Sequence, residues 1–301
     1  MTTHVSVVIP TRDRPQLLRR AISSVLAQSS DVTVEIIVVF DGSAVESLAD
    51  LDAGRHRIRT LPNNRTRGLA GARNTGIAAA SNDYVAFCDD DDEWLPGKLA
   101  AQLPLLDDPH VPLVATGIRV LTTRGAHDRP SPARATHEDL LRSRITELHP
   151  SSFLFRTADA RGRLGGIDED LPASYGEDYD LLLRAAQLGD IVAVPEPLTL
   201  VHWDRSSYFT DRWRGVADGL GYLLDKHAGF ATAPVGRARI EGQIAFAHGA
   251  LGEHRSARTW AGRALRDDWR QLRAYLALIV SLRILSGRRV IAALNARGRG
   301  V

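Results

Sequence analysis

Short apolar runs and amphipathic segments alternate along residues 4–203 of the chain. Runs at 5–9, 34–40, 84–88 and 113–121 are short and almost wholly apolar, which is typical of the buried strands of a parallel sheet. Apolar residues recur instead at helical spacing from 17 to 28, and small residues favour a helix at 68–80. The alternation predicts an α/β fold with a doubly wound, mostly parallel sheet flanked by helices. Further short strands are expected at 58–61, 152–156, 191–194 and 198–203, and a loop at 122–135.

Strand signals end near Thr210, and helical patterns dominate the remaining residues. We therefore expect an α/β domain over residues 1–208 and an all-helical C-terminal extension over 209–301. Residues 246–252 and 257–265 resemble one helix-turn-helix unit of the tetratricopeptide kind. Because a single unit of this kind cannot bury its apolar face alone, it should pack on the core or on a partner.

The last apolar stretch, residues 272–285, is too short and too interrupted to span a bilayer. Arginines flank it, which is the pattern of a helix lying in the interface of an anionic membrane. The alternative is that its apolar side chains pack on the helical region or across a homo-oligomer interface. With no spanning helix or basic leader in the sequence, we expect a cytoplasmic protein, either free or peripheral at the inner face of the cell membrane.

Bulk composition excludes several classes of function. A formal net charge of +2 argues against a dedicated nucleic-acid-binding protein, which would carry a strong basic excess. The single cysteine, Cys88, excludes intrachain disulfides and metal sites built from several thiolates.

Four consecutive aspartates, residues 89–92, follow directly on the apolar run at 84–88. In open α/β sheets, ligands collect at the carboxyl ends of strands. Carboxylate oxygens suit Mg²⁺ or Mn²⁺, which commonly bind one or two carboxylates together with substrate phosphates. The alternative interpretation is a solvated acidic turn.

Other polar residues also follow predicted strands or begin predicted helices. Asp41 could hydrogen-bond a base or a ribose, or could be a turn residue. Arg73 is a candidate phosphate or base contact, or a surface arginine. Glu177 and Asp178 lie at an expected helix start, where acidic residues also favour stability, and either could supply a general base. His202 ends an apolar strand, a position where a lone histidine is more often structural.

Taken together, these motifs resemble the family 2 glycosyltransferases of the GT-A fold, over roughly residues 4–205. The matching pieces occur in the order and spacing of that family: VSVVIPTR at 5–12, DGS at 41–43, ARNTG at 72–76, the aspartates at 89–92 before Trp94, and GEDYDL at 176–181. The resemblance implies a nucleotide-diphosphate sugar donor, most often UDP-linked, a divalent cation, and inversion at the anomeric carbon. It implies as acceptor a hydroxyl of a glycan, a lipid-linked molecule or a small molecule.

The resemblance also implies roles for residues of the nucleotide pocket. Pro10, Thr11 and Arg12 would line the pocket at the end of the first strand. Asp41 would hold the base, and Arg73 would help to grip the nucleotide.

The D-x-D motif of the family matches Asp89 and Asp91. The resemblance implies that Asp89 and Asp90 lie near the ribose and the metal, that Asp91 is the main ligand of Mn²⁺ or Mg²⁺, and that His202 contacts the metal or the diphosphate.

Asp178 matches the catalytic base of the family, with Glu177 in support. One alternative is a nucleotidyltransferase that forms sugar nucleotides, but that class usually has a G-x-G-T-R-like turn where this chain has PTRDR at 10–14. Another is a non-catalytic nucleotide-binding or scaffold protein, which the presence of both Asp91 and Asp178 argues against.

Overall fold

The computed structural model of the chain describes residues 3–28, 31–123, 125–203 and 213–282. The chain separates into two compact units. The first comprises residues 1–137, 145–169 and 177–205, and the second comprises 138–144, 170–176 and 206–301. The domain boundary expected between residues 208 and 209 lies outside the described residues.

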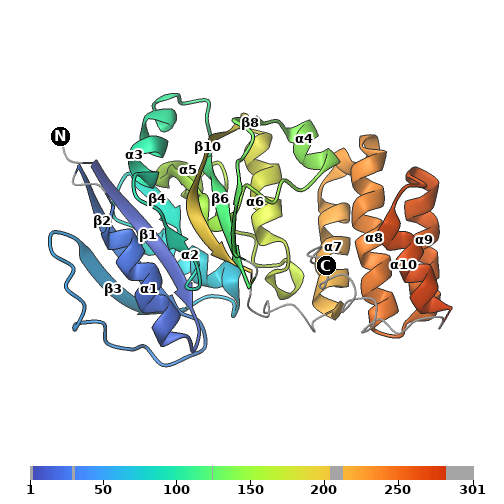
Figure 1. Cartoon of the computed structure of the whole chain (residues 1–301), viewed down its shortest axis with the longest axis horizontal. Coiled ribbons are helices and arrows are strands. Elements are labelled where there is room, and N and C mark those ends of the chain that lie inside the picture. Colours follow the sequence, from blue (N-terminus) through green and yellow to red (C-terminus); the bar gives the residue numbers. More distant parts are fainter. Residues whose placement is uncertain (1–2, 29–30, 124, 204–212, 283–301) are drawn as a thin grey trace. The chain divides into compact units, whose positions relative to one another are not determined.

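The first unit is built on one mixed sheet, in which ten strands can be traced among the described residues (Figure 1). Eight of them follow the order β3-β2-β1-β4-β9-β6-β10-β5, while β7 pairs with β6 and β8 pairs with β10. The strands are β1 (Thr3–Thr11), β2 (Val32–Phe40), β3 (Arg57–Pro62), β4 (Tyr84–Phe87), β5 (Glu93–Trp94), β6 (Val114–Thr122), β7 (Gly125–Arg129), β8 (Arg134–Ala135), β9 (Leu154–Arg156) and β10 (Ile191–His202).

The predicted α/β fold is confirmed, and its parallel part is the run β3-β2-β1-β4. Strand β9 pairs antiparallel with both β4 and β6, so it is a reversed strand between two strands that run in the same direction. Beyond this point β6 and β10 are again parallel to each other.

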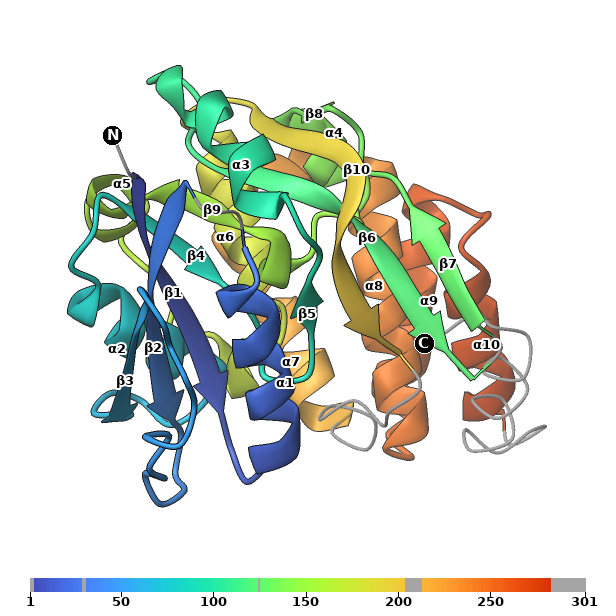
Figure 2. The same ribbon diagram turned by 60° about the vertical axis from the view of Figure 1, so that its left-hand side comes forward.

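Two details of the sheet differ from the sequence-based expectation. The segment 122–135, expected to be a loop, contains β7 and β8, and Figure 2 shows β7 beside β6 as an antiparallel hairpin. Residues 191–203 were expected to form two strands around Pro195 and Pro197, but form the single strand β10. The pairing of β10 with β6 is irregular at these prolines, which is how a strand accommodates residues without an amide hydrogen.

Helices cover both faces of the parallel part of the sheet. Successive side chains of a strand point to opposite faces, so Val7 and Ile9 share a core with Leu18 of α1, whereas Val8 meets Gly76 of α2. The helical segments of this unit are α1 (Pro15–Leu26), α2 (Leu69–Ala79), α3 (Lys98–Gln102), α5 (Thr157–Arg161) and α6 (Glu177–Ala186), with 3-10 turns η1 (Leu103–Asp107) and η2 (Pro150–Ser152).

The second unit is helical, as expected for the C-terminal region (Figure 1). Helices α8, α9 and α10 pack around a core of small side chains and Phe246, against whose ring Trp213 of α7 packs edge-on. No helix among the described residues is long and apolar enough to cross a membrane. The elements are α4 (His137–Arg142), η3 (Pro172–Ser174), α7 (Trp213–Lys226), η4 (Ala228–Thr232), α8 (Pro234–Ala250), α9 (His254–Asp267) and α10 (Leu272–Ser281).

The contact between α2 and β1 gives a test of the packing. A methyl group at Gly76 would lie 2.2 Å from Cγ1 of Val8, so Gly76→Ala should lower the free energy of unfolding by about 1–3 kcal/mol. Gly262 of α9 is the matched control, because an added Cβ there meets no described atom within 4 Å. Gly262→Ala should raise stability by about 0.5–1 kcal/mol through helix propensity. Urea unfolding of both variants measures this, and equal midpoints would contradict the close packing of α2 on β1.

Candidate active site

The ends of three neighbouring parallel strands bring predicted site residues to one edge of the sheet. Thr11 ends β1, Asp41 follows β2, and Asp89 follows β4 after Cys88. The amide of Asp41 donates a hydrogen bond to the carbonyl oxygen of Thr11 at 2.9 Å, and the amide of Cys88 donates to that of Val8 at 3.1 Å. The backbone ladder thus continues past the strands and fixes the residues that follow them.

The aspartates at 89–92 alternate in exposure. The side chains of Asp89 and Asp91 are 20% and 32% exposed, whereas Asp90 and Asp92 are buried. The amide of Asp92 donates to the carbonyl oxygen of Asp89 at 3.1 Å, so the four residues form a tight turn. This turn presents two carboxylates at the surface with one residue between them, which is the spacing of a D-x-D motif.

Asp90 is held from the β1 side of the site. The hydroxyl of Thr11 donates to Oδ2 of Asp90 at 2.7 Å, and Nη1 of Arg14 lies 3.1 Å from Asp90 and 2.9 Å from Asp91. Burial raises the pKa of Asp90 to about 6; the Thr11 hydrogen bond opposes this rise and the neighbouring Asp91 adds to it. Sequence reasoning missed Arg14, although a second arginine within the turn after the first strand was a signal for it.

Arg73 lies at the centre of the site and is buried, with 1% of its side chain exposed. Its Nη2 is 2.7 Å from Oδ1 of Asp89, and its Nη1 is 2.5 Å from Oε1 of Glu177. Although burial acts in the opposite direction, these two carboxylates hold the pKa of Arg73 above its ordinary value. The interpretation of Arg73 as a surface arginine is therefore wrong.

Glu177 and Asp178 begin α6 and are both buried. Burial raises the pKa of Glu177 to about 7; Arg73 opposes the rise, while the negative charges of Asp178 and Asp89 add to it. Asp178 also acts electrostatically on Arg73. The carboxylate predicted to be the base thus belongs to the same charged cluster as the D-x-D turn.

The side chain of His202, which is expected to contact the metal, lies against Glu93. Its Nε2 is 2.8 Å from Oε1 of Glu93, and Nε of Arg20 approaches the same oxygen at 2.8 Å. Within the described part of the chain, no three side chains of the types His, Cys, Asp or Glu are arranged to hold a metal ion by themselves.

Asp41 and Arg12 have contrasting environments beside the strand ends. Oδ1 of Asp41 accepts from Nδ2 of Asn63 at 2.8 Å and from the amide of Gly68 at 3.1 Å, so this buried carboxylate organises the loop before α2. Arg12 is 37% exposed at its side chain, and its Nε lies 4.0 Å from the carboxylate of Asp13. Pro10, just before Thr11, is buried within β1.

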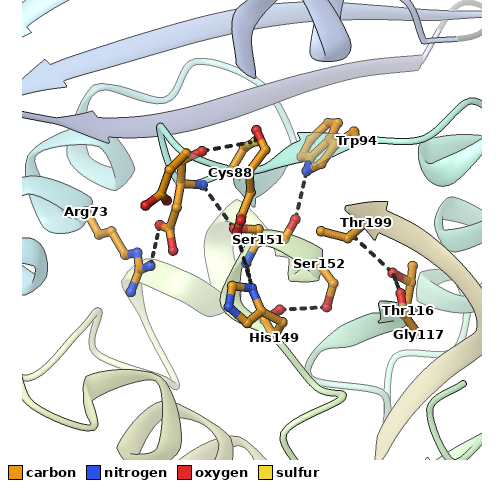
Figure 3. A network of polar contacts seen from close by, with 12 residues as sticks. Arg73, Cys88, Trp94, Thr116, Gly117, His149, Ser151, Ser152 and Thr199 are labelled. Atoms are coloured by element: carbon orange, nitrogen blue, oxygen red, sulfur yellow. Dashed lines mark hydrogen bonds and ion pairs between the residues drawn. The ribbon is translucent and has the colours of Figure 1, made fainter. Parts of the chain in front are cut away.

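A polar network behind the aspartates was not predicted (Figure 3). The hydroxyl of Ser151 donates to Oδ2 of Asp92 at 2.5 Å and accepts from the amide of Asp89 at 3.0 Å. Nε1 of Trp94 donates to the carbonyl oxygen of Ser151 at 2.7 Å, and Nδ1 of His149 lies 3.4 Å from Oδ2 of Asp92. The one signal for this network was the polar run HPSS at 149–152, directly before an apolar strand.

The paired state of Arg73 gives a stability prediction. Arg73→Met leaves Asp89 and Glu177 without their shared cation, and breaking a buried ion pair from one side costs about 3–5 kcal/mol. Arg134→Met, which removes a mostly exposed partner of Asp190, is the control and should leave the urea midpoint where it is. If both variants unfold at the same urea concentration, Arg73 does not stabilise the site.

Comparisons with known proteins agree with this geometry. The model of the family "Glycosyl transferase family 2" matches residues 6–164. The uncharacterized protein Rv1520 of Mycobacterium tuberculosis is 26% identical over 239 residues, which cover 73% of this chain and 68% of that protein.

Two solved structures share the fold at low sequence identity. TarS (residues 1–349) of S. aureus in complex with UDP-GlcNAc is 16% identical, with a TM-score of 0.61 over 99% of this chain and 93% of that one. The mannosyltransferase PcManGT of Pyrobaculum calidifontis in complex with GDP-Man and Mn²⁺ is 20% identical, with a TM-score of 0.54 over 97% and 84% of the two chains. Since the family match alone covers more than half of the sequence, the chain is a glycosyltransferase of the GT-A fold and belongs to glycosyl transferase family 2.

Proposed function

We propose that the chain is an inverting, metal-dependent glycosyltransferase. It moves a sugar from a nucleotide-diphosphate donor, with UDP as the proposed nucleotide, to an acceptor hydroxyl. The observation that supports it most is the buried Arg73, which joins Asp89 of the D-x-D turn to Glu177, the neighbour of Asp178. One cation thereby ties the carboxylates expected on the donor side to those expected on the acceptor side. The acceptor is a glycan, a lipid-linked molecule or a small molecule.

The nucleotide is proposed to bind at the ends of β1 and β2. Pro10 and Thr11 form the floor at the end of β1, and Asp41 is fixed beside them for the base. Arg12 is an exposed cation at this edge and is assigned to the phosphates, because guanidinium suits phosphate oxygens. Arg73 is assigned an indirect role, since its ion pairs with Asp89 and Glu177 direct the guanidinium to carboxylates of the site.

The charge balance of the cluster fits a divalent cation. Five carboxylates, at positions 89, 90, 91, 177 and 178, face the two guanidinium groups of Arg14 and Arg73. The pKa values of Asp90 and Glu177 are raised, mainly by burial and further by neighbouring carboxylates.

We assign Mn²⁺ or Mg²⁺ to Asp91 and Asp89, the two carboxylates that remain partly exposed. These ions bind well through one or two carboxylates plus substrate phosphates, so a complete protein cage is not required. Bound there, the cation supplies Lewis-acid stabilisation of the charge that develops on the leaving diphosphate. The Nε2 atom of His202 is already engaged by Glu93, so the assignment rests on the aspartates.

The transfer follows from the position of Asp178 in the cluster. A bond forms between the acceptor oxygen and the anomeric carbon while the bond from that carbon to the phosphate oxygen breaks. The acceptor proton passes to the carboxylate of Asp178. A single displacement of this kind inverts the anomeric carbon and forms no covalent sugar–enzyme intermediate, unlike a retaining glycosidase. Glu177 holds Arg73 and keeps the start of α6 against the D-x-D turn.

The metal assignment predicts a loss of donor binding in Asp91→Asn. Removing one ligand charge should weaken binding of UDP in the presence of Mn²⁺ by about tenfold or more, with the fold retained because Asp91 is partly exposed. Isothermal titration calorimetry measures the affinity, and Asp128→Asn, an exposed partner of Arg119, serves as the control. Unchanged affinity in Asp91→Asn would overturn the assignment of the metal.

The assignment of Asp178 as the base predicts that Asp178→Asn slows sugar transfer without weakening donor binding. Donor affinity should stay at the wild-type value, while release of nucleoside diphosphate in the presence of acceptor should fall by about 10²-fold or more. The control is Asp190→Asn, a partly exposed carboxylate paired with Arg134. Transfer at the wild-type rate would place the base elsewhere. Release of pyrophosphate instead of nucleoside diphosphate would identify a nucleotidyltransferase.

A further inference from the structure

Helix α10 buries mainly small side chains and leaves several large apolar side chains exposed. Ala274, Ala277 and Val280 are buried within the helical unit, in the core that α8 and α9 share. Leu272, Tyr275 and Leu282 are 55%, 41% and 60% exposed. An ordinary surface helix has the reverse arrangement, with polar residues outward.

The exposed residues form one stripe. Positions 272, 275, 279 and 282 follow the spacing of three and four residues that places side chains on the same face of a helix. Trp269, immediately before α10, is 67% exposed, and the guanidinium of Arg270 lies 5.3 Å from the centre of its ring. We call Trp269, Leu272, Tyr275 and Leu282 the apolar face of α10. Exposed apolar side chains gathered on one face of a helix are a candidate interaction surface.

The part of the sequence that begins with this face carries charge of one sign. From Trp269 to the end of the sequence there are seven arginines and no aspartate or glutamate, a formal charge of +7. The whole chain carries +2, so residues 1–268 carry −5. The nearest acid, Asp268, accepts hydrogen bonds from the amide of Arg270 and from Nε2 of Gln271, and Asp267 is paired with Arg237.

We propose that the apolar face of α10 docks on the surface of an anionic lipid bilayer, with the helix lying in the headgroup region. Apolar side chains edged with arginine are the composition of interfacial helices, and tryptophan and tyrosine favour this depth because each has an apolar ring and a polar atom. Anionic headgroups attract a segment that holds only positive charge.

A second copy of the chain is the weaker candidate for this face. The commonest dimers are two-fold symmetric and place the same patch of both subunits in contact. Such a contact would bring the face and its copy together with Arg270 and Arg273 on each, and residues 269–282 hold no aspartate or glutamate to compensate them. The bilayer is therefore the occupant that complements both the apolar and the charged character of the segment, and this inference does not depend on the proposed transfer reaction.

Flotation with lipid vesicles tests the proposal on the full chain. The wild type should float with vesicles of phosphatidylglycerol and phosphatidylcholine, and about tenfold less with pure phosphatidylcholine or at high salt. The triple variant Trp269→Gln, Leu272→Gln, Leu282→Gln should lose about tenfold in flotation, because it removes the apolar contact and keeps every charge. The control variant Val235→Gln, Leu251→Gln removes two exposed apolar residues elsewhere in the helical unit and should float as the wild type does.

Circular dichroism and the thermal midpoint establish that both variants are folded, as expected for substitutions at exposed positions. The proposal is overturned if the wild type stays with the unbound fraction on anionic vesicles, or if the triple variant floats as the wild type does. Equal flotation with neutral vesicles would overturn the role of the arginines. Light scattering provides the remaining outcome: a wild-type dimer that dissociates in the triple variant, without flotation of either, would make a second copy the occupant.

Discussion

A buried guanidinium shared by two carboxylates holds the catalytic unit together. Arg73 comes from α2, Asp89 from the turn after β4, and Glu177 from the first residue of α6, so one side chain fixes three elements. Taking these charges out of water is costly, and a buried ion pair is often no more stable than apolar residues would be. The arrangement instead positions the two carboxylates, because a planar guanidinium that bonds both of them sets the distance and orientation between them.

The same constraint leaves the site with unbalanced charge. Arg14 and Arg73 neutralise only part of the carboxylate cluster, and burial with mutual repulsion raises the pKa values of Asp90 and Glu177. In the proposed function, a divalent cation supplies the opposite sign. The alternation of exposure along 89–92 leaves Asp89 and Asp91 for that proposed cation, because Asp90 bonds Thr11 and Asp92 bonds Ser151 on the inner side of the turn.

Sequence patterns predicted the strands and helices that depend on neighbouring residues, and missed the side-chain contacts that depend on residues far away in the chain. The buried strand expected at 34–40 appears as β2, and the small residues at 68–80 form α2, because burial on both faces requires apolar or small side chains throughout. Strand β7 was missed since its residues are mostly exposed and polar, and β10 was divided because two prolines interrupt its pattern. The partners of Arg73 lie 16 and 104 residues away, and Glu93 lies 109 residues from His202, so no local pattern contains them.

The last apolar stretch shows why composition alone left two alternatives. Both a packed helix and an interfacial helix require many apolar residues, and the stretch from Leu272 provides them on every side. The structure divides them by size: Ala277 and Val280 fill the narrow space against α8 and α9, and Leu276 covers part of that core. Leu282 stays outside, and Ile284 lies beyond the described residues. Packing within the unit therefore accounts for Ala277 and Val280, whereas Leu272, Tyr275 and Leu282 stay exposed and are the side chains that the proposed contact with a bilayer would cover.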